Sequence, residues 1–212
     1  MAGLSSGGVA AAWLSAYAKP GQVIGACYED PPLFSSEVDP AVGPSLRQAI
    51  GPVFAVMAKY LGPQWSIGDW EGMGAALPDE LPPWLAMIAG LFGVGGGEGP
   101  PQPLKEYDPE WGQAFWTGAF FGSCDHDRML RSVRVPVLFT HHLRTIDEAT
   151  GALLGASSDT QAARVAELVT GAGQPFTAVD LPTMAHSLHG TDPQLYVDTL
   201  LPWAAELTEE PS

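Results

Sequence analysis

The chain has few basic residues, although it has many acidic ones. Nine Lys and Arg stand against 24 Asp and Glu over 212 residues, so the formal net charge is −15. Nucleic acids and anionic membranes are also negatively charged and would be repelled. The composition therefore argues against both classes of partner.

The sequence also has few cysteines, no long apolar run and no recognisable secretory signal. Cys27 and Cys124 are too few for a disulfide framework. No stretch approaches the roughly 18–20 apolar residues that a transmembrane helix needs. Residues 1–8 lack the basic segment of a secretory signal. From these absences we expect a cytoplasmic protein.

What is present is an alternation of helical and strand patterns. Apolar periodicity predicts helices at 8–18, 46–61, 125–132, 160–170 and 196–207, and strands at 22–28, 135–140 and 175–181. Strands that alternate with helices predict an α/β fold with a mostly parallel sheet, flanked by helices on both faces.

The regular alternation of helical and strand patterns is lost over residues 33–123. Pro, Gly and Trp interrupt the apolar pattern, and 93–103 is a Pro/Gly-rich stretch that predicts a loop. We therefore expect a helical insertion at 33–123 between two parts of one core, 1–32 and 124–212. The many Trp, Phe and Met side chains of the insertion suit an apolar ligand pocket.

The motif that points to chemistry is Gly3-Leu4-Ser5-Ser6-Gly7, which spells G-x-S-x-G. In enzymes with this pattern, the serine occupies a sharp turn between a strand and a helix. A serine hydroxyl is a weak nucleophile unless a base takes its proton and an acid orients that base. The motif therefore predicts Ser5 as a nucleophile with a His and a carboxylate nearby.

Both partner types follow predicted strands. His186 and His189 lie in a loop after the last strand, Glu29 and Asp30 follow the first strand directly, and Asp147 lies beyond the strand at 135–140. The ends of parallel strands meet at one edge of a sheet, where these side chains could converge.

Other polar residues have simpler interpretations. We expect His141 and His142 to pack at a strand end and contact solvent. We expect Asp125 to cap the helix that follows it rather than to bind a metal with His126.

On these residues the chain resembles the C-terminal half of the α/β-hydrolase superfamily. In that family the catalytic His lies seven residues before a Pro, as His186 does before Pro193 (193 − 186 = 7). GLSSGG followed by CYEDP is similar to the GCSSGA and CHELP patterns of a subgroup that includes the zearalenone lactonases. That subgroup has a Glu as its acid, and Glu29 lies at the matching separation from Ser5 (29 − 5 = 24).

The resemblance implies a serine hydrolase acting on an apolar ester or lactone, with no cofactor and no metal. It implies a triad of Ser5, His186 and Glu29, with Asp147 and Asp30 as alternative acids. The backbone N–H of Ser6 would be one oxyanion donor. It also implies that the insertion is a cap over the site.

Trp111 of this insertion is similar to a substrate-facing cap tryptophan of the lactonase subgroup.

The resemblance also predicts a partial fold. The family's N-terminal strands and its second oxyanion donor would precede Met1. The alternative function is therefore an N-terminally truncated fragment that is inactive or depends on a partner. An unpaired sheet edge could then cause self-association.

Overall fold

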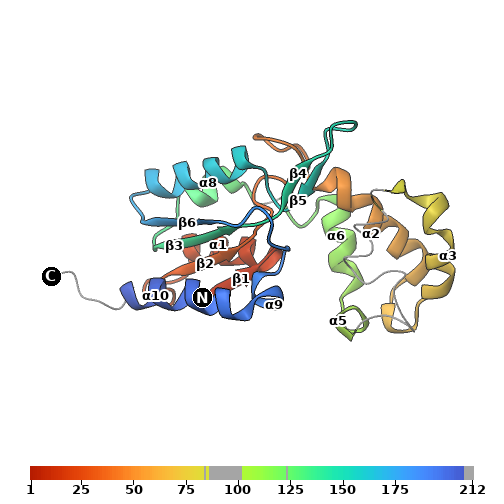
Figure 1. Cartoon of the computed structure of the whole chain (residues 1–212), viewed down its shortest axis with the longest axis horizontal. Coiled ribbons are helices and arrows are strands. Elements are labelled where there is room, and N and C mark those ends of the chain that lie inside the picture. The colour runs from red at the N-terminus through yellow and green to blue at the C-terminus, as the bar shows by residue number, and fades with distance from the viewer. Residues whose placement is uncertain (84, 86–101, 123, 208–212) are drawn as a thin grey trace. The chain divides into compact units, whose positions relative to one another are not determined.

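The computed structural model describes residues 1–83, 85, 102–122 and 124–207, and it divides the chain into two compact units (Figure 1). Unit 1 comprises Met1–Leu46 and Cys124–Ser212, and unit 2 comprises Arg47–Ser123. Residues 33–46, which were predicted to be part of the insertion, group with unit 1.

Unit 1 is built on a four-stranded sheet in the order β1-β2-β3-β6. The strands are β1 (Ala2–Leu4), β2 (Ala26–Glu29), β3 (Val137–His141) and β6 (Phe176–Asp180). Every neighbouring pair is parallel, and Glu29 is aligned with Leu4 on one side and Thr140 on the other. The carboxyl ends of the first three strands therefore lie side by side.

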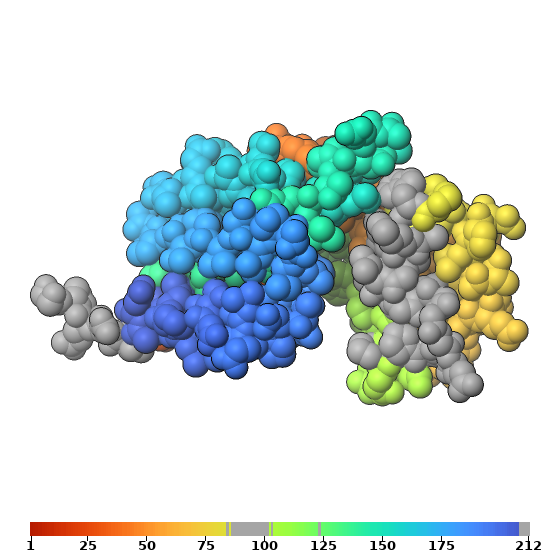
Figure 2. Space-filling model, in the orientation of Figure 1, coloured from red at the N-terminus to blue at the C-terminus, as the bar shows by residue number. Residues whose placement is uncertain are grey.

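Helices cover both faces of this sheet (Figure 1). They are α1 (Ser6–Tyr17), α7 (His126–Leu130), α8 (Asp159–Gly171), α9 (Leu188–Thr191) and α10 (Pro193–Glu206). On one face, Cys27 and Leu138 pack against Trp203 of α10. In Figure 2, residues from α8 to α10 form most of the visible surface of unit 1.

Local sequence signals explain where these helices begin. Ser158 and Gln161 form a capping box at α8, and the side chain of Asp125 accepts from the N–H of Arg128 at α7. The side chain of Asp192 caps α10, with Pro193 in its first turn. The predicted capping role of Asp125 is thus confirmed.

Most predicted elements of unit 1 are found, and the α/β class with a parallel sheet is confirmed. Two features were missed. Strand β1 is only three residues long, and an antiparallel hairpin pairs β4 (Arg144–Ile146) with β5 (Leu153–Gly155). Three-residue strands are too short to show the alternation that identifies a strand in sequence.

Unit 2 is helical in the part that the structure describes. Its elements are α2 (Arg47–Leu61), the 3-10 helix η1 (Trp65–Ile67), α3 (Trp70–Glu80), α5 (Gln102–Lys105) and α6 (Pro109–Thr117). The predicted loop at 93–103 lies outside the described residues up to 101, and its last two residues belong to α5.

Aromatic rings pack together with aliphatic side chains in the described interior of unit 2. Trp65 stacks on Tyr107 with ring centroids 4.9 Å apart, and Phe54 packs against Phe115 at 5.7 Å. A Cβ on Gly112 of α6 would lie 2.9 Å from the Phe54 ring, so glycine permits this close approach.

Over the described residues, no helix combines the length and the apolar character needed to cross a membrane.

Candidate active site

Ser5 lies at the turn between β1 and α1. Its φ of 55° and ψ of −122° fall in a region that non-glycine residues rarely occupy. The Ser5 backbone N–H donates to the carbonyl of Glu29 at 2.9 Å, which ties the turn to β2. The Ser5 side chain makes no capping hydrogen bond to α1. The hydroxyl is therefore held at a strained turn without being used by the helix.

Of the two glycines in the G-x-S-x-G motif, only one lies where a side chain would not fit. A Cβ on Gly3 would clash with the backbone carbonyl of Gly7, whereas a Cβ on Gly7 would meet nothing within 4 Å. The second close approach involves Gly8, whose Cβ would lie 2.8 Å from the Pro31 side chain. The tightness of the turn thus explains Gly3 and Gly8 but not Gly7.

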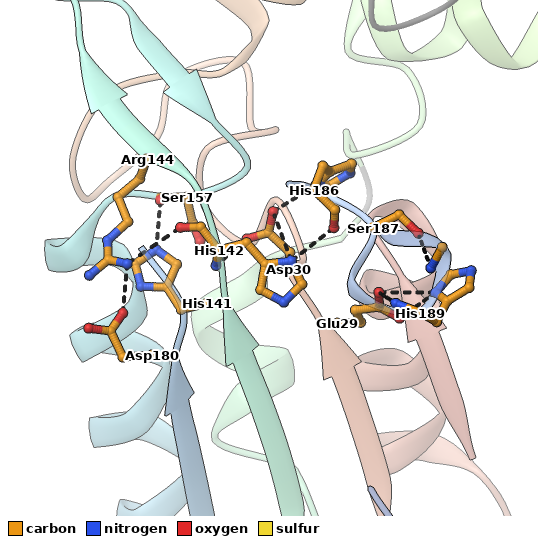
Figure 3. Close-up of polar contacts among 11 residues, drawn as sticks. Glu29, Asp30, His141, His142, Arg144, Ser157, Asp180, His186, Ser187 and His189 are labelled. Atoms are coloured by element: carbon orange, nitrogen blue, oxygen red, sulfur yellow. Dashed lines mark hydrogen bonds and ion pairs between the residues drawn. The ribbon is translucent and has the colours of Figure 1, made fainter. Parts of the chain in front are cut away.

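His186 is held by a buried carboxylate directly after β2. Its Nδ1 lies 2.6 Å from Oδ2 of Asp30, whose side chain is 1% exposed, while the His186 side chain is 46% exposed (Figure 3). A carboxylate accepts, so Nδ1 carries the proton and Nε2 carries the lone pair in the neutral ring. This is the orientation that a general base needs.

The Asp30 carboxylate has a second donor directly after β3. Its Oδ1 accepts from the backbone N–H of His142 at 3.2 Å. The fully buried His142 ring also holds the loop that carries His186, because the Nδ1 of His142 lies 2.9 Å from the carbonyl of His186. A carbonyl only accepts, so this nitrogen is the donor.

His142 was expected only to pack and contact solvent, and His141 beside it is also buried. The sequence signal for His142 was its position directly after a buried strand.

Glu29 contacts a different histidine from the one that was predicted. Its Oε2 lies 2.8 Å from Nδ1 of His189, and its Oε1 accepts from the His189 backbone N–H at 3.1 Å. The expected contact between Glu29 and His186 is absent. The carboxylate that is bonded to His186 is Asp30 instead. Asp30 was an open alternative in the sequence.

The direction of consecutive side chains explains this correction. Glu29 is the last residue of β2, where side chains alternate between the two faces, and Asp30 lies one residue beyond the strand. Asp30 also has a positive φ of 40°, and its N–H donates to the carbonyl of Thr140 on β3. Asp30 therefore faces the β3 side of the loop and Glu29 faces α9.

Asp147, the other alternative acid, lies in the β4–β5 hairpin. Its carboxylate accepts from the Thr150 N–H at 2.8 Å, and its own N–H donates to the carbonyl of Ala152. These contacts stabilise the hairpin turn and do not involve His186. The structure thus gives Asp147 a local role in the turn.

The remaining predicted residues are placed as follows. Ser6 is the first residue of α1, where backbone N–H groups have no partner within the helix. Trp111 lies in α6 of unit 2 and packs against Phe115, with ring centroids 5.7 Å apart.

Cys27 of β2, two residues before Glu29, has a buried thiol. Burial, together with the negative charge of Glu29, raises the pKa of Cys27 to about 12. Burial likewise raises the pKa of Tyr196, whose ring lies 5.7 Å from the His189 ring, to about 12. At neutral pH neither group ionises readily.

No cluster of three or more metal-binding side chains occurs among the described residues.

This sheet, with its strand–Ser–helix turn and a His loop after the last strand, is similar in fold to solved hydrolase structures that are longer than this chain. The structure is similar to that of a hydrolase from Pseudomonas aeruginosa PA01, with a TM-score of 0.52 and 15% identity over 96% of this chain and 63% of that chain. It is also similar to MenH from S. aureus, with a TM-score of 0.53 and 16% identity over 98% of this chain and 68% of that chain.

A third similar structure is an E-2-(acetamidomethylene)succinate hydrolase, with a TM-score of 0.50 and 16% identity. The match covers 97% of this chain and 66% of that chain. The chain thus spans about two thirds of the length of the solved structures it matches. No family model matches the chain, and no curated protein matches it in sequence.

Proposed function

We propose that this chain is a serine hydrolase that acts on an ester or lactone of an apolar small molecule. Ser5 is the nucleophile, His186 the general base, and Asp30 the acid that orients the base. The observation that carries the proposal is the buried Asp30 carboxylate on Nδ1 of a half-exposed His186, at the same sheet edge as the strained Ser5 turn.

The reaction follows from the protonation states. Nε2 of His186 takes the Ser5 proton as Oγ attacks the substrate carbonyl, and the C=O electron pair moves to the oxyanion. The Ser6 N–H donates to that oxyanion. The intermediate collapses, the C–O bond of the ester breaks, and the leaving oxygen takes the proton from His186. Water then repeats these steps on the acyl-enzyme.

Asp30 rather than Glu29 is the acid in this proposal, because a hydrogen bond to Nδ1 sets the tautomer of the ring. The substrate class rests on the family resemblance, as does Trp111 as a substrate contact. Asp147 has no part in this mechanism, since its carboxylate is used in the hairpin turn.

The alternative function is a fragment that is inactive or depends on a partner. It is supported by the share of the solved structures that the chain spans, 63% of one and 68% of another. In that case the chain would supply the nucleophile, base and acid, and other residues would supply a second oxyanion donor. Loss of one oxyanion donor typically costs ~10²–10³ in kcat.

The test is covalent labelling of the 212-residue chain by a fluorophosphonate probe, followed by mass spectrometry. We expect the phosphonyl group on Ser5. Ser5→Ala should lower the labelling rate by at least ~10³-fold, as loss of a triad nucleophile does. Ser6→Ala is the matched control, because it keeps its backbone N–H and should label at nearly the normal rate.

Hydrolysis of p-nitrophenyl butyrate then separates the two functions. Labelling of Ser5 with turnover supports the hydrolase, whereas labelling without turnover supports the partner-dependent fragment. A wild-type chain that stays unlabelled would contradict the proposed triad.

A further inference from the structure

The end of β2 holds two histidine–carboxylate pairs rather than one (Figure 3). Asp30 binds Nδ1 of His186 at 2.6 Å, and Glu29 binds Nδ1 of His189 at 2.8 Å. Both carboxylates are buried, at 1% and 2% exposure, and the histidine side chains are 46% and 50% exposed. The two pairs therefore have the same construction.

The second pair has the same proton arrangement as the first. The Glu29 carboxylate accepts from Nδ1 of His189, so the lone pair of the neutral ring lies on Nε2. Glu29 also accepts from the His189 backbone N–H at 3.1 Å. The ring is thus fixed twice, and its remaining nitrogen can accept a proton.

The second pair is also bonded to the nucleophile turn. The carbonyl of Glu29 accepts the backbone N–H of Ser5 at 2.9 Å, so one residue contacts both Ser5 and His189. Leu4 is aligned with Glu29 in the sheet, which places Ser5 next to the end of β2.

Glu29 contacts both the backbone N–H and the imidazole of His189. The imidazole is an additional group, and half of it is exposed. A buried carboxylate such as Glu29 costs free energy unless it is well paired. Its pairing with His189 therefore stabilises one defined orientation of the His189 ring.

We propose that His189, oriented by Glu29, is a second general base for Ser5; this rests on the proposed function. Nε2 of His189 takes the Ser5 proton while Oγ bonds to the substrate carbonyl carbon, whose π electrons move to oxygen. When the intermediate collapses, the leaving oxygen takes that same proton from His189. No other reactant takes part in this acylation step, water hydrolyses the acyl-enzyme afterwards, and His186 performs the same transfer when it is present.

The first experiment measures the fluorophosphonate labelling rate of Ser5 in single and double variants. We expect His186→Gln to lower the rate by ~10²-fold, within the usual range for a general base. We expect His189→Gln alone to change it by less than about 3-fold, because His186 remains. The double variant should be at least ~10-fold slower than His186→Gln.

Glu29→Gln in the His186→Gln background should slow labelling like the loss of His189, because the ring loses its acid. Glu148→Gln, an exposed residue of the β4–β5 hairpin, is the matched control and should have no effect. His186→Ala provides a second background if the glutamine variant folds poorly.

The second experiment reads the tautomers directly from the imidazole ¹⁵N shifts. We expect both rings to be protonated at Nδ1, with Glu29→Gln shifting His189 and Asp30→Asn shifting His186. A role in structure alone would not couple the labelling rate of the His186→Gln chain to the His189 tautomer.

The outcomes separate the two proposals. If the wild type is labelled but the double variant equals His186→Gln, the second base is wrong and the proposed function stands. If His186→Gln labels at the wild-type rate, the assignment of His186 is wrong. If the wild type is not labelled at Ser5, the proposed function fails, and the second base fails with it.

Discussion

The two units bury different kinds of side chain. Every buried polar or charged side chain among the described residues belongs to unit 1: Ser15, Glu29, Asp30, Ser35, Ser36, Ser45, His126, Thr140, His141, His142, Ser157, Ser158 and Gln161. The described buried residues of unit 2 are apolar or glycine. Buried polar groups cost free energy unless they are bonded, so they mark where the fold holds specific chemistry.

Unit 1 depends on backbone geometry and on protonation states, because its buried polar groups must find partners. Unit 2 depends on packed rings, whose contacts do not change with pH. Each of the following substitutions should therefore disturb one unit and leave the other intact.

Gly3→Ala should have the largest effect, on unit 1. The new Cβ would clash with the carbonyl of Gly7, and neither backbone can move without opening the Ser5 turn. We expect a loss of about 4 kcal/mol in the free energy of unfolding, near the top of the range for single substitutions. Urea denaturation measures this loss.

Gly7→Ala is the matched control for Gly3→Ala. A Cβ there meets nothing within 4 Å, and alanine favours the helix by up to ~1 kcal/mol. A Gly7→Ala chain as unstable as Gly3→Ala would mean that the turn is not the cause.

Acid should destabilise unit 1 through His126. This buried ring accepts the Phe34 N–H at Nδ1, and burial lowers its pKa from 6.5 to about 4. Between these values the unfolded chain binds more protons, so stability falls as pH drops from about 6.5 to about 4. The loss reaches about 3 kcal/mol at 1.36 kcal/mol per pKa unit.

Hydrogen exchange, corrected for intrinsic rates, measures this loss in α7. His126→Asn should remove the part of the pH dependence that comes from this ring, since the Asn oxygen can accept the Phe34 N–H but does not titrate there. Equal acid sensitivity of α2 in unit 2 would contradict the comparison between the units.

Trp111→Leu should have the smallest effect, on unit 2. The Trp111 ring packs against Tyr107, Phe115 and Phe120, with centroids 5.6–5.7 Å apart. Loss of these ring pairs should cost about 2 kcal/mol. Exchange should rise in α2 and α6 but not in β3.

Trp13→Leu in α1 is the control for Trp111→Leu, because Trp13 is 48% exposed and should contribute little. If β3 loses as much protection as α6 in the Trp111 variant, the cluster does not act within unit 2 alone.

The elements of unit 1 were largely predictable because they are local patterns. Helices α1, α8 and α10 have apolar periodicity or alanine, with caps at α8 and α10, and β3 is a continuous apolar run. The hairpin β4–β5 and strand β1 were not predictable, because strands of three residues depend on pairing rather than on their own pattern.

The site was predictable in residue type but not in pairing. The sequence indicated a carboxylate directly after the predicted strand at 22–28 and a His in the loop after the last strand. It could not decide between Glu29 and Asp30, because adjacent residues differ only in side-chain direction. The positive φ of Asp30 and its bond to Thr140 decide that direction, and both arise from the assembled sheet.

By itself, the sequence determined the serine turn, the helix after it and the α/β alternation, because each depends on residues close together in the chain. Only the tertiary structure decided which carboxylate holds which histidine. The histidine loop meets the end of β2 across more than 150 residues, at separations of 156 for Asp30 and 160 for Glu29. Contacts at that range are set by strand register and side-chain direction, which no local pattern records.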